Sequence, residues 1–240
     1  MSTVTNPIDA PSEAIACMAS LVGSLADNKA ALGQRYAEWA VSAPTLESAV
    51  AAAAMAQDEL GHARSTYPVL KALGAEADED GFGGERRLKL LDQELPDWGS
   101  LIAANVLIDG VLTTFVAACA GSSVTQLAQR ASKILQEEGS HRVHAEAWTR
   151  RLCRTPSERD RFIARLEETW QHAARWAGPA DDPAFAAALE AGMIKRDPGT
   201  QREQVRSWLT ALLDSEGVAI SMPEPEDWSR WDSDRRRWEP

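Results

Sequence analysis

Apolar residues recur at steps of three and four along most of the chain, and clusters with a period of two are missing. This pattern predicts helices almost throughout and therefore an all-α fold. Four long helices are expected over residues 12–41, 46–73, 96–120 and from the turn at 121–123 to about 153. Shorter helices are expected over residues 85–93, from 156 to about 178, over 183–193 and over 199–216.

Local signals support several of these boundaries. Pro44 ends the first helix, and Thr45 can cap the second. Pro68 predicts a kink near the end of the second helix. Residues 74–85, GAEADEDGFGGE, form an acidic and glycine-rich connection between two helix pairs. Residues 155–158, TPSE, match a capping box with proline at the first helical position.

Two of the long helices carry the same pair of polar residues. Glu59 and His62 lie three apart in the second helix, and Glu138 and His141 lie three apart in the fourth. Residues at this spacing share one face of a helix. In both helices the pair falls on the apolar stripe, so we expect all four side chains to point into the bundle.

The other two long helices each place one charged residue on their apolar stripe. Asp109 is the acidic residue in the run VLIDGVLTTFVAA, and Lys29 lies on the stripe of the first helix. An unpaired carboxylate in such a position would cost several kcal/mol or take up a proton. We therefore expect Asp109 and Lys29 to meet the two pairs in the middle of the bundle.

Two Glu-x-x-His pairs, with one carboxylate from each remaining helix, are typical of dimetal four-helix bundles. Here Lys29 stands where the first helix would supply its carboxylate. Oxygen and imidazole donors suit iron or manganese. The predicted metal ligands are Glu59, His62, Asp109, Glu138 and His141.

Other interpretations of these residues stay open. A single Glu-x-x-His pair is weak evidence, because solvated pairs of this kind are common. The ammonium of Lys29 could replace a metal ion and neutralise three carboxylates, although the sum of −2 would favour at least one divalent cation. A neutral Lys29 beside metal ions is also consistent with the sequence. The neighbouring Asp27, Glu38, Glu137, His144 and Glu146 are expected to lie off the inner faces.

Composition limits the class of protein. The net charge of −11 argues against general nucleic-acid binding. The three cysteines have no CxxC spacing, the first residues lack a signal pattern, and no apolar run approaches 18 residues, so we expect a cytoplasmic protein without a membrane span. Nine tryptophans and long amphipathic helices favour a dimer.

Five segments resemble the phenylacetate-catabolism ferritin-like family, to which the bacterial phenylacetyl-CoA epoxidase belongs. They are LGQRYAEW (32–39), SAPTLE (42–47), QDELGHAR (57–64), LIDG (107–110) and QEEGSH (136–141). The resemblance implies a ferritin-like four-helix bundle over about 12–153, accessory helices over about 155–216 and a tail over 217–240, all in a single domain. It covers roughly residues 15–155.

That family has two related large subunits, a catalytic one that binds two irons and a non-catalytic one that has lost most ligands. The catalytic pattern carries over onto the five predicted ligands, but the glutamate of its first helix aligns with Lys29. The segment LADNKAALGQRYAEW is more similar to the non-catalytic subunit.

Two hypotheses follow from the resemblance. The first is a carboxylate-bridged oxygenase with two irons, or with one ion or manganese, in which Lys29 donates a proton. It would use a separate reductase and a small organic substrate, such as an aromatic acyl-CoA, and would form a homodimer or pair with a related large subunit. The second is a non-catalytic partner subunit, in which Lys29 replaces the metal and the tail with Trp228, Trp231 and Trp238 either docks the catalytic chain or packs on its own bundle.

Overall fold

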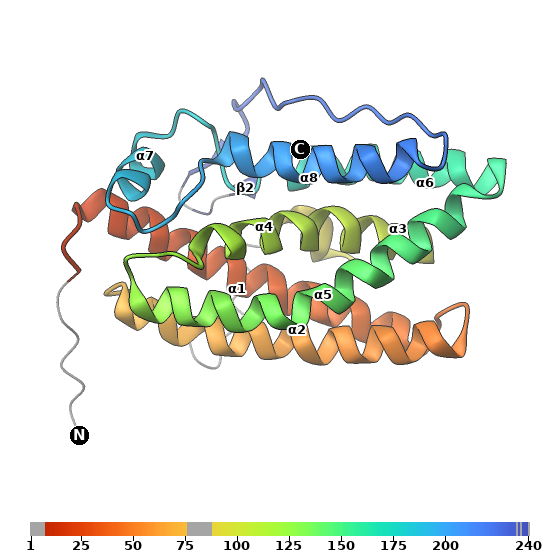
Figure 1. Ribbon diagram of the computed structural model, residues 1–240, viewed down its shortest axis with the longest axis horizontal. Helices are drawn as coiled ribbons and strands as arrows, with labels where there is room; N and C mark the ends of the chain where they lie inside the picture. Colours follow the sequence, from red (N-terminus) through yellow and green to blue (C-terminus); the bar gives the residue numbers. More distant parts are fainter. Residues whose placement is uncertain (1–7, 76–87, 234, 236, 240) are drawn as a thin grey trace.

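The computed structural model describes residues 8–75, 88–233, 235 and 237–239, and most of them are helical. Four long helical segments form a bundle (Figure 1). They are α1 (Ser12–Ala40), α2 (Leu46–Ala72), the uninterrupted run of α3 (Trp98–Ala104), η2 (Asn105–Asp109) and α4 (Gly110–Cys119), and α5 (Thr125–Cys153). The predicted all-α, ferritin-like bundle is therefore confirmed.

Three further helices cover one side of the bundle. They are α6 (Pro156–Ala173), α7 (Pro183–Glu190) and α8 (Pro198–Asp214), and in Figure 1 α6 and α8 lie above α4. A short 3-10 helix, η1 (Lys89–Asp92), and an antiparallel pair of strands, β1 (Trp231–Asp232) and β2 (Arg237–Trp238), complete the described elements. Buried apolar side chains form one continuous core that extends from Ala14 in α1 to Met222 beyond α8.

Most predicted helix boundaries agree with the structure to within three residues. Thr45 caps α2 by accepting a hydrogen bond from the Ser48 amide at 3.2 Å. The capping box at Thr155 was wrong, because its side chain makes no capping hydrogen bond, although Pro156 does begin α6. The predicted end near residue 178 was also wrong, since α6 ends at Ala173. Most of the predicted loop over 74–85, and the start of the short helix at 85, lie outside the described residues.

The helical run Trp98–Cys119 forms the centre of the bundle. Among the described residues it is the one helix long and apolar enough to cross a membrane, with a mean hydropathy of 1.9. Polar residues such as Asn105 and Asp109 interrupt it, so it is not an uninterrupted apolar run of 18 residues. In the structure 78% of its most apolar window is buried, as in a core helix.

This central helix contains an irregularity that the sequence pattern did not predict. Residues Asn105–Asp109 form a π-helical turn between α3 and α4. A π turn shifts the residues that follow it around the helix axis and is frequent at functional sites. Here it ends at Asp109, the acidic residue that points into the bundle.

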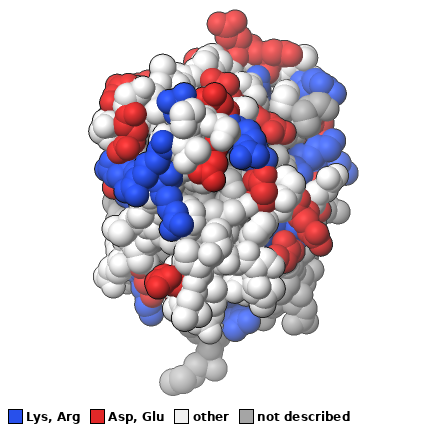
Figure 2. Space-filling model, turned by 90° about the vertical axis from the view of Figure 1, so that its right-hand side faces the viewer, with Lys and Arg blue, Asp and Glu red and all other residues white. Residues whose placement is uncertain are grey.

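The end of the molecule that includes the α1–α2 connection is unevenly charged. Figure 2 shows this end of the molecule, with charged side chains gathered in its upper part and a largely uncharged lower part. Val41, Leu46 and Val50, which lie at this connection, are 88%, 78% and 63% exposed.

Candidate functional site

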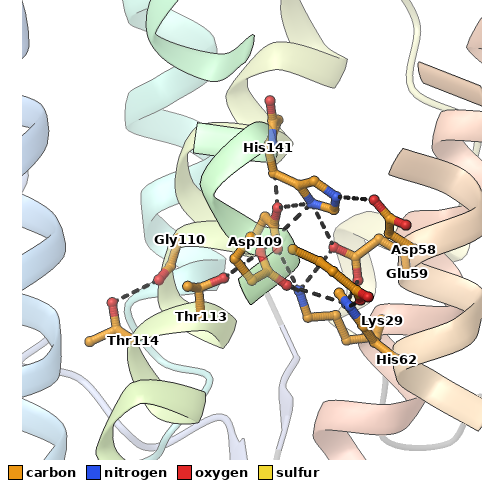
Figure 3. A network of polar contacts seen from close by, with 12 residues as sticks. Lys29, Asp58, Glu59, His62, Asp109, Gly110, Thr113, Thr114 and His141 are labelled. Carbon is orange, nitrogen blue, oxygen red and sulfur yellow. Dashed lines mark hydrogen bonds and ion pairs between the residues drawn. The ribbon is translucent and has the colours of Figure 1, made fainter. Parts of the chain in front are cut away.

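Lys29 lies at the centre of a buried cluster of charged groups (Figure 3). Its Nζ is 2.9 Å from Glu59 Oε1, 2.6 Å from Asp109 Oδ1 and 2.7 Å from Glu138 Oε1. None of these four side chains is more than 4% exposed. The four long helical segments of the bundle each contribute one member, at the positions where charged residues interrupt the apolar stripes.

The two histidines also contact the buried carboxylates of the cluster. His141 Nδ1 lies 3.0 Å from Asp109 Oδ2 and 3.3 Å from Glu59 Oε1, and His62 Nδ1 lies 3.3 Å from Glu138 Oε1. The structure thus brings all six predicted site residues together.

Each imidazole also contacts a carboxylate on its outer side. His62 Nε2 lies 2.7 Å from Glu137 Oε2, and His141 Nε2 lies 3.3 Å from Asp58 Oδ2. Both outer carboxylates are partly exposed. Such an outer partner fixes the orientation of the ring, so that Nδ1 points inward in both histidines.

The charges shift one another's pKa values strongly. Burial lowers the pKa of Lys29, but the carboxylates of Asp109, Glu138 and Glu59 outweigh it and raise the pKa well above its usual value. Burial likewise opposes the charged form of Asp109, yet the Lys29 ammonium and the hydrogen bond from His141 hold its pKa well below the usual range. The ammonium is therefore fixed in its charged state.

The histidines gain protons in this environment. For His141, burial is outweighed by hydrogen bonds to Asp109 and Glu59, which raise the pKa to about 11. For His62, burial is outweighed first by the contact with Glu138, and the pKa is raised from 6.5. Glu59 is the group that resists ionisation, because burial and the charge of Asp109 raise its pKa to about 7 despite Lys29.

These protonation states change the charge count of the core. Three ionised carboxylates and one ammonium sum to −2, but the proton on His141 and the raised pKa values of His62 and Glu59 make this charge less negative. The divalent cation expected from the sequence rested on a charge count without the histidines. The net charge of the core is therefore less negative than that count.

Several supporting residues were missed or misplaced from the sequence. Thr113 donates a hydrogen bond to Glu138 Oε2 at 2.8 Å, and its position four residues after Asp109 on the same helix face could have revealed it. His144 was expected off the core, but it packs edge-on against Trp98 with ring centroids 6.0 Å apart. Asp27 was also expected off the core, but it is buried and accepts a hydrogen bond from Tyr67 at 2.9 Å.

The donor types and spacing of part of the cluster would suit one metal ion. Glu59, Asp109, Glu138 and His141 each offer a ligand atom, and these atoms lie within 4.8 Å of one another. Glu59 Oε2 accepts no hydrogen bond from any described residue. A pair of ions does not fit, because the first helix supplies an ammonium in place of a carboxylate, and this ammonium already bonds all three acids.

A cavity of about 390 Å³ opens beside the cluster. It lies between the central helix, α5 and α8, on the side of the bundle that faces away from α2. Asp109, Glu138 and His141 line its inner end.

Comparisons with known proteins agree with this architecture. A family model described as phenylacetic acid catabolic protein matches residues 1–240. A curated relative, one of the subunits of the 1,2-phenylacetyl-CoA epoxidase of Escherichia coli (strain K12), is 31% identical over 134 residues. The match covers 53% of this chain and 54% of the relative, so the chain spans about half the length of that protein. The family resemblance of the sequence motifs is thereby confirmed, and the chain belongs to the phenylacetic acid catabolic protein family.

Proposed function

We propose that the protein is a non-catalytic, metal-free partner subunit of a multicomponent oxygenase of this family. The observation that carries the proposal is the position of Lys29. Its Nζ lies within hydrogen-bonding distance of one oxygen from each of three buried carboxylates, at 2.6, 2.7 and 2.9 Å. The ammonium supplies the positive charge that would otherwise require a metal ion.

A metal ion would have to displace this ammonium. An ammonium has three N–H donors and no lone pair, and each donor of Lys29 has a carboxylate partner. Lys29 would become a ligand only after losing its proton, which the surrounding carboxylates oppose by raising its pKa. Ion binding would therefore break three charge-assisted hydrogen bonds and leave a cation next to a cation.

The proposed partner is a related large subunit that keeps a carboxylate on its first helix. The curated relative is itself a subunit of an epoxidase, which supports an assembly of several chains. In this proposal the catalytic chain holds the iron, takes electrons from the reductase and binds the organic substrate, such as an aromatic acyl-CoA. The present chain contributes a rigid bundle to the assembly.

The second candidate function is the carboxylate-bridged oxygenase itself. It is favoured by the four ligand atoms that lie within 4.8 Å of one another. The residues that would hold iron or manganese are Glu59, His62, Asp109, Glu138 and His141, and the metal would supply oxygen activation. Lys29 would then have to leave its present position and act as a proton donor.

Metal analysis of the purified chain, produced with iron and manganese in the medium, separates the two functions. We expect far less than one metal ion per chain in the wild type. Lys29→Glu, which restores the missing carboxylate, should raise the metal content, whereas Lys133→Glu on the exposed face of α5 should not. About two irons per wild-type chain, as in dimetal bundles, would support the oxygenase instead.

A further inference from the structure

The cavity beside the charged cluster lies between three elements, the central helix, α5 and α8. Its volume of about 390 Å³ lies within the range of small-molecule sites. Figure 3 shows Thr113 beside Asp109 and Thr114 further from the cluster, next to Gly110, and both threonines line the cavity. The space is therefore large enough, and close enough to the charged groups, to hold a small ligand.

The inner end of the cavity presents hydrogen-bond acceptors. Asp109 and Glu138 both line it, and Lys29 Nζ bonds one carboxylate oxygen of each. The second oxygen of Asp109 is bonded to His141. Glu138 Oε2 accepts from Thr113 and keeps further lone pairs.

His141 also lines this end, but its ring nitrogens are already paired with Asp109, Glu59 and Asp58. A ligand that reaches Glu138 Oε2 must therefore bring a donor, and a carboxylate would meet the carboxylates of the cluster.

The walls of the cavity are mainly apolar. Val106, Leu135, Ala145 and Val205 line it, and the ring of Trp208 lies towards the outer end. Such walls favour a hydrocarbon or aromatic body over a sugar or a phosphate.

Two residues that line the cavity, Arg142 and Trp208, contact each other and Glu146. Trp208 of α8 donates its indole N–H to Glu146 of α5 at 3.1 Å, and the Arg142 guanidinium lies 4.7 Å from the Trp208 ring centroid. Arg142 in turn donates to Glu146 at 3.1 Å. Arg142 and Trp208 both line the cavity, and because Arg142 is exposed and Trp208 half-buried, this contact lies where the cavity reaches solvent.

We propose that this cavity is a binding site for a small uncharged amphipathic molecule, with an apolar ring or chain against the walls and a hydroxyl group that donates to Glu138 Oε2 at the inner end. The proposal goes beyond the partner-subunit function and does not depend on it. In this proposal the ligand contacts the carboxylates of the cluster from the cavity, on the side that Lys29 leaves open.

Two probes of equal skeleton test the chemistry of the inner end. Isothermal titration of the full chain with 3-phenylpropan-1-ol should give saturable binding with a Kd of about 1 mM or tighter, as expected for a ligand of this size. We expect 3-phenylpropanoate, which replaces the hydroxyl group by a carboxylate, to bind at least roughly tenfold more weakly. Tighter binding of the acid, or no saturable binding of the alcohol, would overturn the proposal.

A pair of matched variants tests the location. Thr114 lines the cavity and donates its hydroxyl to Gly110 O at 2.8 Å, and Ser132 makes the same type of bond to Ala128 O at 2.9 Å on the exposed face of α5. Thr114→Phe fills the cavity and should weaken binding of the alcohol at least roughly tenfold, whereas Ser132→Phe should leave it unchanged. Equal affinities of the two variants, both folded by circular dichroism, would place the ligand elsewhere and overturn the assignment.

The metal content of the same samples keeps this proposal separate from the proposed function. Metal-free protein that binds the alcohol supports both. Iron-loaded protein that binds the alcohol more tightly than the acid contradicts the partner-subunit function alone. Metal-free protein that does not bind it contradicts the ligand site alone.

Discussion

The three carboxylates around Lys29 would repel one another without it. Glu59, Asp109 and Glu138 come from three different helices, and each is bonded to the same nitrogen. Desolvating so many charges is costly, and the cluster is tolerable only while every charge keeps its partner. Loss of Lys29, which neutralises the acids, should therefore have the largest effect on the stability of the protein.

Replacement of Lys29 by methionine keeps a side chain of similar length and removes the charge. We expect Lys29→Met to lower the free energy of unfolding by about 3–5 kcal/mol, because it leaves buried carboxylates without their cation. Chemical denaturation measures this loss. Lys133→Met, on the exposed face of α5, is the control and should stay within about 0.5 kcal/mol of the wild type. Equal stabilities of the two variants would mean that Lys29 is not the charge partner of the cluster.

The histidines predict how stability depends on pH. The pKa of His141 is raised from 6.5 to about 11 in the folded protein, so the folded state holds a proton that the unfolded state loses. Its stabilisation is complete below pH 6.5 and declines as the pH rises towards about 11. The unfolding equilibrium constant should increase by up to about tenfold per pH unit in this range.

Denaturation of the wild type and of His141→Gln between pH 6.5 and 9 tests this dependence. The range stops at pH 9 because the buried thiol of Cys119, whose usual pKa is 9.0, also contributes to the pH dependence of stability above it. The variant should show a distinctly flatter profile. Parallel profiles would contradict a protonated His141 in the folded state.

At the scale of the helices, α1 and α2 approach each other closely at Gly33. A β-carbon built there would lie 3.0 Å from Leu60 Cγ, 3.1 Å from Glu59 Cβ and 3.2 Å from Ala56 O. This close approach lets Lys29, one turn earlier on α1, reach the acid of α2. The small residue is thus part of the geometry of the cluster.

Alanine substitution separates packing from helix propensity. Gly33→Ala should destabilise the protein by about 1–3 kcal/mol, because α1 and α2 must move apart. Gly139→Ala, in α5 with open space around it, should stabilise it by roughly 0.5–1 kcal/mol. Thermal unfolding of both variants gives the comparison. A stabilising effect of Gly33→Ala would show that the two helices do not need this contact.

The helices show what could be predicted from the sequence. The three-and-four periodicity gave the four long helices, and the charged residues on the apolar stripes identified Lys29 and Asp109 as inward-facing. The π turn at Asn105–Asp109 has no local signature, because it depends on how the central helix packs between its neighbours. The outer contacts of the imidazoles with Asp58 and Glu137 were missed for a similar reason, since they join residues of different helices.

At the scale of the whole molecule, the C-terminal tail holds the accessory helices together. The Trp170 indole in α6 donates to Pro223 O at 2.8 Å, and Arg202 of α8 binds Glu224. Further along the tail, the ring centroid of Trp238 lies 4.3 Å from the Arg175 guanidinium and 5.5 Å from the ring of His172. The tail therefore packs on its own bundle, which was one of the two roles expected for it.

This packing leads to a prediction that distinguishes a structural tail from a docking segment. Trp238→Ala removes the ring between Arg175 and His172 and should lower the free energy of unfolding by about 1–3 kcal/mol. The mass in solution, measured by light scattering, should not change, because the ring faces the protein's own helices. Glu226→Ala, at an exposed position of the same tail, should alter neither quantity. If Trp238→Ala instead left stability intact and reduced the mass of the assembly, the tail would act on a partner chain, and its packing on α6 would be incidental.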